Sequence, residues 1–242
     1  MKSSTKQLAP RLLASLLSIV VMAPMSPSYV FAQPASSQSN APLSQQQLSA
    51  LVAPIALYPD PLVSQILMAS TYPLEVGEAA TWQKQNSRLT GSALDNALQS
   101  QSWDPSVKSL VSFPQALQMM GSDLSWTQKL GDAVLAQQSD VMTAIQAMRA
   151  KAKQAGNLSS TSQQTVSTSG QTIIIQPANP QVVYVPTYNP SVVYGPWPYP
   201  AYPPPPPYYP PGYVAGTALL SFGVGMAVGA ALFGGMHWGG GW

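Results

Sequence analysis

Apolar residues recur three or four positions apart from residue 43 to 157, which predicts a compact bundle of short α-helices. Ser44 and Gln47 match a capping box, in which both side chains bond to the backbone where a helix begins. Gly156 suits the end of the last predicted helix, 139–155. The same spacing predicts further helices from residue 61, at 74–85, at 92–100, from 105, at 115–120 and from 124.

The pattern changes after residue 157. Residues 158–170 are almost entirely Ser, Thr and Gln, which predicts a polar linker. The β-branched run at 172–176 predicts a strand within a small extended element at 171–195. Consecutive prolines at 203–207 impose polyproline II geometry, so residues 196–212 are predicted to form a Pro/Tyr-rich stalk.

One phrase within this extended element occurs twice. The sequence NPQVVY at 179–184 returns as NPSVVY at 189–194. Each Asn-Pro step favours a turn followed by extended backbone, which predicts short strands at 182–185 and 192–194. We expect the two copies to form a structured joint between the helical domain and the uncharged remainder of the chain.

Residues 213–236 carry no charge, and one helix of that length would reach about 36 Å, enough to cross a membrane. Small residues at four-residue spacing allow membrane helices to approach closely. The segment is predicted to be a Gly-rich apolar helix that spans a membrane or self-associates; a hairpin that binds partners without spanning is the alternative. The candidate association residues are Thr217, Ser221, Gly223, Gly225, Ala227, Gly229 and Ala231.

The first 32 residues have the features of a secretory signal peptide. A positive start is followed by an apolar core at 12–23, and cleavage is expected after Ala32. Residues 33–42 are then a disordered mature N-terminus, and 237–242 form a Gly/Trp tail. Loss of the signal removes three basic residues and leaves the chain close to neutral, which argues against a nucleic-acid partner. The protein is expected in the periplasm or cell envelope.

The composition offers little for catalysis or metal binding. There is no cysteine and one histidine, His237, so no metal or cofactor site is predicted. Glu75 and Glu78 share a helical face and are interpreted as solvated, while Asp60 is interpreted as a helix cap. No catalytic residue is predicted; the alternative is a domain in the helical region that binds or modifies cell-wall material.

The Pro/Tyr-rich region is also a candidate interaction surface. Proline fixes the backbone before docking, so little entropy is lost, and aromatic rings supply contact area. A rigid spacer is the alternative role, and the two are compatible. The candidate partner-binding residues are Tyr184, Tyr188, Tyr194, Trp197 and Tyr199.

Four segments together resemble a known family. They are LVAPIALYPDPLVSQILMASTYP, WDPSVKSLVSFP, WTQKLGDAVLAQQSDVMTAIQAMR and NPQVVYVPTYNPSVVYGPWPYP. The chain is similar in them to the uncharacterised YacH-like proteins of Gram-negative bacteria, in which a domain of unknown function follows a signal peptide. The resemblance implies an exported envelope protein and brings no activity, cofactor or catalytic residue.

The sequence therefore predicts a mainly α protein that acts in the cell envelope without catalysis. The expected partners are a membrane or an envelope protein, and a second copy of the chain through the Gly-rich segment.

Overall fold

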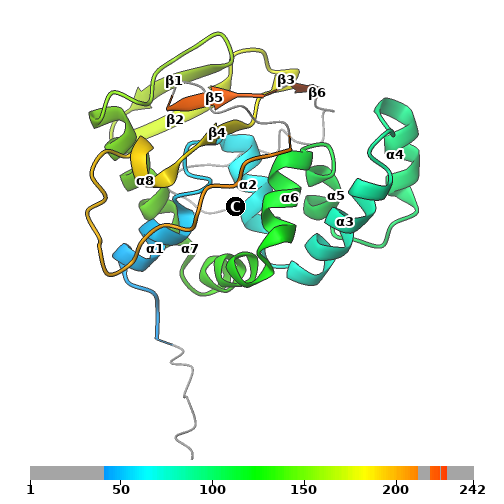
Figure 1. The fold of residues 1–242 in the computed structure, drawn as a ribbon, viewed down its shortest axis with the longest axis horizontal. Helices are drawn as coiled ribbons and strands as arrows, with labels where there is room; N and C mark the ends of the chain where they lie inside the picture. Colours follow the sequence, from blue (N-terminus) through cyan, green and yellow to red (C-terminus); the bar gives the residue numbers. More distant parts are fainter. Residues whose placement is uncertain (1–40, 212–218, 224, 228–242) are drawn as a thin grey trace, which may run out of the picture. The chain divides into compact units, whose positions relative to one another are not determined.

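The computed structural model describes residues 41–211, 219–223 and 225–227, and these belong to one compact unit that begins at Ala41. The fold is mainly α, as the periodicity predicts, with small strand pairs on one side (Figure 1). The predicted signal peptide and the 237–242 tail lie outside the described residues. The helices are α1 (Gln45–Val52), α2 (Asp60–Ala69), α3 (Pro73–Gln85), α4 (Gly91–Gln99), α5 (Pro105–Leu110), α6 (Pro114–Ser122), α7 (Leu124–Gln154) and α8 (Pro190–Val193).

The helices are short because proline and capping residues mark where they begin. Ser44 and Gln47 form the predicted capping box at the start of α1. Proline occupies the first turn of α2, α3, α5 and α6. Proline has no backbone N–H, and in the first turn of a helix an N–H would have no helical partner, so no hydrogen bond is lost. Proline also disfavours helical backbone at the residue before it. The sequence thus separates these helices before any packing occurs.

Helix α7 is long but is interrupted at Gln137, whose φ and ψ are −152° and 51°. Its side chain bonds twice to the backbone of Leu43, with Oε1 accepting from N at 2.6 Å and Nε2 donating to O at 3.0 Å. This break agrees with the two separate helices that the sequence predicts from 124 and from 139. The two hydrogen bonds from Gln137 to Leu43 also hold the start of the described chain against the middle of α7.

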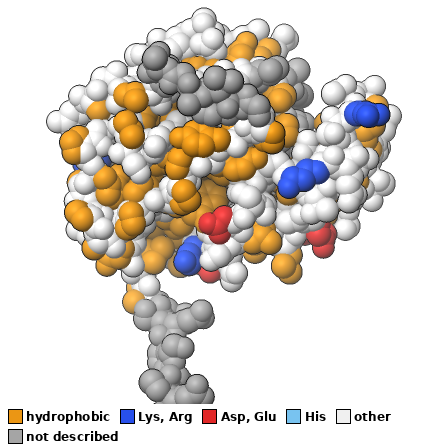
Figure 2. All heavy atoms as spheres, in the orientation of Figure 1, with side chains coloured by type: hydrophobic (Ala, Val, Ile, Leu, Met, Phe, Trp, Pro, Cys, Tyr) orange, Lys and Arg blue, Asp and Glu red, His pale blue; other side chains and the backbone are white. Residues whose placement is uncertain are grey.

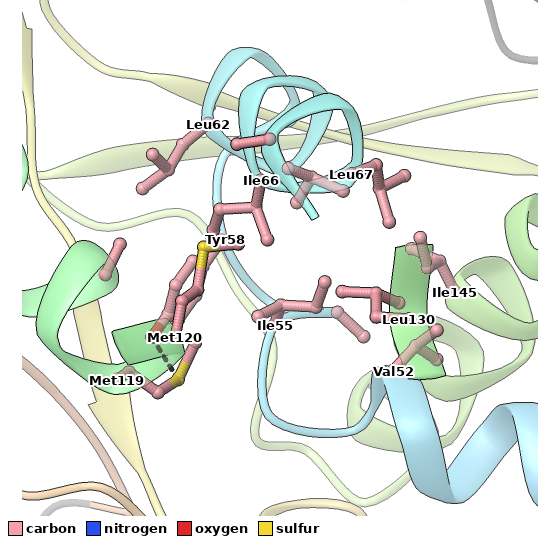
Figure 3. Packing of buried hydrophobic residues seen from close by; sticks show 14 of the residues in the cluster. Val52, Ile55, Tyr58, Leu62, Ile66, Leu67, Met119, Met120, Leu130 and Ile145 are labelled. Carbon is pink, nitrogen blue, oxygen red and sulfur yellow. Dashed lines mark hydrogen bonds between the residues drawn. The ribbon is translucent and has the colours of Figure 1, made fainter. Parts of the chain in front are cut away.

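The helices and the extended residues share one core. Figure 3 shows Val52, Ile55, Leu130 and Ile145 close together, beneath side chains of α2. The same buried cluster continues into residues beyond the helical region, among them Ile175. The region after residue 157 is therefore part of the folded unit that the helices form.

The predicted linker 158–170 is wrong in its second half. Strand β1 (Gln164–Ser169) pairs antiparallel with β2 (Thr172–Pro177). Gly170, at φ 60°, begins the two-residue connection, where a positive φ suits a tight hairpin turn. Polar residues can form this strand because their backbone groups pair with β2, which supplies most of the apolar side chains.

The two copies of the repeat adopt different structures. The first contains β3 (Val182–Val183), and β4 (Pro186–Tyr188) follows it. The second copy forms the helical turn α8, so the strand predicted at 192–194 is wrong. Asn179 and Asn189 each accept a hydrogen bond from the amide two residues later, at 2.9 Å. Both copies thus begin with the same Asn side-chain hydrogen bond, but the first continues as a strand and the second as a helical turn. The helical turn places Val193 and Tyr194 in the core.

The described part of 213–236 is extended, which corrects the predicted helix for those residues. Strand β5 (Leu220–Phe222) pairs with β4, and β6 (Met226–Ala227) pairs with β3. Strands β3 and β4 have backbone groups that need partners, and these two short strands supply them. Within the described ranges, no helix has both the length and the apolar character needed to cross a membrane.

Four of the predicted association residues lie in this extended part. Ser221 Oγ donates to the carbonyl of Thr187 at 3.3 Å, and Ala227 pairs with Val182 in register. A Cβ at Gly225 would lie 2.5 Å from Val182 and 2.7 Å from Tyr184, so glycine permits that approach. Gly223 lies near Gln115. Thr217, Gly229 and Ala231 lie outside the described residues.

The Pro/Tyr-rich segment runs along the folded unit in Figure 1 instead of projecting from it, which corrects the predicted stalk. Trp197 and Tyr208 pack against the core cluster. Pro207 and Tyr208 also line a small cavity with Tyr58. Figure 2 shows hydrophobic side chains gathered over this segment and α8, with few charges on the face drawn.

Candidate functional site

Arg149, from α7, is fully buried and uses its guanidinium to join three parts of the chain. Nη1 contacts Asp60 Oδ1 at 2.6 Å and donates to the carbonyl of Ile173 at 2.9 Å. Nε donates to the carbonyl of Ala56 at 2.8 Å, and Nη2 to that of Tyr58 at 3.0 Å. The α1–α2 loop, α2 and β2 are thereby held by one side chain.

Asp60 pairs with this arginine, whereas the sequence interpretation makes it a helix cap. It is the first residue of α2 and lies in the first turn of that helix. Its Oδ1 also accepts from the amide of Ile175 at 3.4 Å. Burial lowers the pKa of Arg149 and the nearby Asp60 charge opposes that change, so the guanidinium stays protonated. The pair is a structural link.

Two of the predicted partner-binding tyrosines belong to the same buried region. The Tyr188 hydroxyl donates to the carbonyl of Ala53 at 3.0 Å and accepts from the amide of Leu57 at 3.3 Å. The Tyr194 hydroxyl donates to the same carbonyl of Ala53. Both side chains are buried, so their contact area serves the core. The two hydroxyls thus hold the α1–α2 loop against the segment from residue 188 to 194.

The other three predicted partner-binding residues are half-buried. Tyr184 lies against Gly225. Trp197 Nε1 donates to the carbonyls of Tyr199 and Tyr202, at 3.1 and 3.0 Å, which folds the proline-rich segment back on itself. The ring of Tyr199 lies 5.9 Å from Lys151 Nζ. A partner-binding role for these three stays a prediction.

The buried tyrosines predict a loss of stability at high pH. Burial raises the pKa of Tyr58, Tyr188 and Tyr194 above the ordinary value of 10.0. Above pH 10 the unfolded chain releases these protons while the folded chain keeps them, so the free energy of unfolding falls. Each tyrosine contributes a slope of about 1.4 kcal/mol per pH unit.

Urea denaturation between pH 9 and 11, about one unit either side of the ordinary tyrosine value, measures this slope. Tyr188→Phe is expected to reduce this slope by one tyrosine's share, whereas Leu135→Ala, at a 74% exposed position without a titratable group, leaves it unchanged. An equal slope in wild type and Tyr188→Phe would contradict the assignment.

An open groove lies on α3, beside the segment that leads into α5. Its lining residues are Gly77, Glu78, Thr81, Trp82, Gln85 and Trp103. Trp82 is half-buried and Trp103 is buried, and their ring centroids lie 5.9 Å apart at an interplanar angle of 80°. The two indoles form an aromatic corner that opens to solvent.

Of the predicted carboxylate pair, Glu78 lines this groove, and both carboxylates hold the segment beside it. Glu78 Oε2 accepts from Trp103 Nε1 at 3.1 Å. Glu75 Oε2 accepts from the amide of Asp104 at 2.6 Å. The pair therefore fixes the 103–104 segment against α3. In the described part of the chain, no three His, Cys, Asp or Glu side chains gather where they could hold a metal.

Sequence reasoning missed the groove because its two indoles come from separate segments. Trp82 follows Glu78 by one helical turn, which the sequence does show. Trp103 reaches the same place only through the fold, with its indole hydrogen bond to Glu78 as the connection.

The comparisons with known proteins agree with the resemblance found in the sequence. Residues 44–241 match the family model described as protein of unknown function (DUF3300). The chain is 40% identical over 230 residues to the Uncharacterized protein YacH of Escherichia coli (strain K12), covering 81% of this chain and 37% of that protein. The chain thus spans little more than a third of that relative's length. No solved structure matches. The chain belongs to the DUF3300 family of YacH-like proteins, whose function is unknown.

Proposed function

We propose that this protein is an exported, noncatalytic component of the cell envelope that works by binding, with the α3 groove as its binding surface. The observation that carries the proposal is the corner made by Trp82 and Trp103, which opens to solvent on a rigid helix. Aromatic side chains supply large contact area at low entropic cost. The positively charged, then apolar, leader supports export.

The acidic residues that the sequence offers as candidates for catalysis form structural contacts, which favours a binding role over a catalytic one. Asp60 is committed to Arg149 in the core, and Glu75 and Glu78 are committed to the backbone and indole of the 103–104 segment. A general acid or base must reach the proton it transfers. Glu75 and Glu78 have geometry suited to holding the groove in shape.

Attachment to a membrane or to a second copy through residues 213–236 is part of the same proposal. The absence of charge from residue 213 to 236 supports it. A truncation at Gly212 is a poor test, because it also removes β5 and β6, which pair with β4 and β3. Cross-linking of the full chain in the envelope fraction tests self-association directly, and recovery of monomer alone would count against it.

In-cell proximity labelling tests the groove. The full chain carrying a labelling enzyme at its C-terminus is expected to mark a specific set of envelope components. Trp82→Ala should remove most of that set, since it deletes the open part of the aromatic corner. Leu135→Ala, at a 74% exposed position on α7, is the matched control and should leave the set intact. Identical sets from both variants would exclude the groove.

A cell-wall-binding domain in the helical region is the alternative, and the same groove favours it because indoles and carboxylates together suit polar ligands. Co-sedimentation with purified cell-wall sacculi distinguishes binding to wall material from binding to another envelope component. Binding to sacculi that Trp82→Ala abolishes would identify wall material as the partner. Asp60 variants are unsuitable here, because they disrupt the core pair with Arg149.

A further inference from the structure

We propose that the α3 groove binds an alkylammonium group, a cation that carries its charge on an alkyl-substituted nitrogen. This deepens the proposed binding role and rests on it. Three features of the groove carry the inference: the aromatic corner, an excess of negative charge, and an apolar ledge beside it.

The aromatic corner matches a compact cation in shape. Trp82 and Trp103 stand at 80° to each other, with centroids 5.9 Å apart. Rings at this angle present two surfaces that meet at a corner, and a rounded group fits into such a corner. The indole face is the aromatic surface that attracts cations most strongly, and weakly hydrated alkylammonium groups are recognised by such rings.

Negative charge gathers at this end of α3. Glu78 lines the groove and bonds to the Trp103 indole, and Glu75 bonds to the backbone amide of Asp104, the next residue. Among the residues that the structure describes, the one salt bridge is Arg149–Asp60, so none of these three carboxylates forms one. Their charge is also felt by Tyr72, whose pKa is raised chiefly by Asp104, with a smaller contribution from Glu75. A cationic ligand would supply the missing counter-charge.

An apolar ledge continues the groove toward the start of α3. Leu74 is 78% exposed and Leu124 is 39% exposed. The Leu124 side chain lies 3.2 Å from where a Cβ of Gly77 would stand, and Gly77 lines the groove. Alkyl substituents of a bound ammonium can therefore cover apolar surface while the charge faces Glu78. This combination distinguishes an alkylammonium from a hydrated metal cation.

Titration of the full processed chain with choline and with its neutral isostere 3,3-dimethyl-1-butanol tests the proposal. Indole fluorescence and the NMR signal of the Trp103 Nε1 proton report binding at the corner. Choline is expected to bind saturably and about tenfold more tightly than the isostere, because cation–π attraction and the carboxylates act on charge. Equal affinities, or no saturable binding of choline, would overturn the proposal.

Matched variants place the binding at the groove. Glu78→Gln keeps an acceptor for the Trp103 indole and removes the charge, so choline affinity should fall severalfold while binding of the isostere is unchanged. Trp82→Leu should abolish the preference for choline. Asp95→Asn, at an exposed carboxylate on α4, is the control and should retain full affinity. Unchanged choline affinity in Glu78→Gln would contradict the assigned role of that carboxylate.

Two further results separate this proposal from the function on which it rests. If labelling in cells depends on Trp82 but choline does not bind, the groove is a binding surface for another chemistry and the alkylammonium proposal fails alone. If choline binds but labelling is independent of Trp82, the site is real and the proposed cellular role of the groove fails. Vesicles of phosphatidylcholine, compared with soluble choline, show whether the source is a lipid headgroup or a free ion.

Discussion

Replacement of Arg149 by methionine is expected to lower the free energy of unfolding by about 3 to 5 kcal/mol, the cost of removing one partner from a buried ion pair. The Asp60 side chain, which is only 11% exposed, would lose its ion-pair partner. The carbonyls of Ala56, Tyr58 and Ile173 would also lose donors. Methionine fills similar volume, so the effect reports lost charge and hydrogen bonds more than a cavity.

Urea denaturation followed by circular dichroism measures this loss. Lys129→Met, on the exposed face of the same helix, is the matched control and should change stability by less than about 0.5 kcal/mol. The double variant Asp60→Leu with Arg149→Met should recover part of the loss, since it removes the orphaned charge but leaves the carbonyls unpaired. Similar stabilities for Arg149→Met and Lys129→Met would contradict a central role for the pair.

Gly131→Ala is expected to destabilise the protein by about 3 kcal/mol, at the upper end for overpacking. A Cβ at this position in α7 would stand 2.1 Å from the carbonyl oxygen of Ser70 and 2.7 Å from its carbon. Both are backbone atoms after α2, so relief requires a shift of one helix against another. Helix propensity alone would favour alanine by about 1 kcal/mol. A destabilising result therefore measures the close contact.

Gly77→Ala is the matched control for this substitution, because it too lies within a helix. Its added Cβ meets Leu124 Cδ1 at 3.2 Å, the end of a partly exposed side chain that can move. Gly77→Ala is therefore expected to be neutral or slightly stabilising in thermal denaturation. Equal thermal midpoints for Gly131→Ala and Gly77→Ala would contradict the close approach of α7 to the residues after α2.

Local signals account well for the helical elements. Ser44 begins α1, proline begins four more helices, and the interruption at Gln137 agrees with two predicted helices on either side. These features depend on hydrogen bonds and backbone angles within a few residues, which a single sequence displays. The 31-residue span of α7 thus consists of two helical halves that meet at Gln137.

The extended region was less predictable because its partners lie far away in sequence. Strand β1 consists of polar residues except for Val166, and it is defined by pairing with β2. Strand β5 comes from a Gly-rich apolar run that has helical small-residue spacing, yet its backbone pairs with β4. Backbone pairing between strands depends little on which side chains the strands carry. Composition alone therefore mispredicts the secondary structure of these two segments.

The candidate groove shows the same division. The sequence placed Glu75 and Glu78 on one helical face and assigned them to solvent. The fold brought Trp103 and Asp104 against that face, which gave both carboxylates a hydrogen-bond donor and created the aromatic corner.

The sequence by itself determined the helical character of residues 43–157, most of the helix starts and the family. Those properties follow from periodicity, capping and short motifs, whose physics is local. The tertiary structure decided that Asp60 meets Arg149, that the second repeat copy turns helical, and that Tyr188 and Tyr194 bond to the α1–α2 loop. Burial decides these contacts, because a charge or hydroxyl removed from water must find a partner wherever the chain brings one.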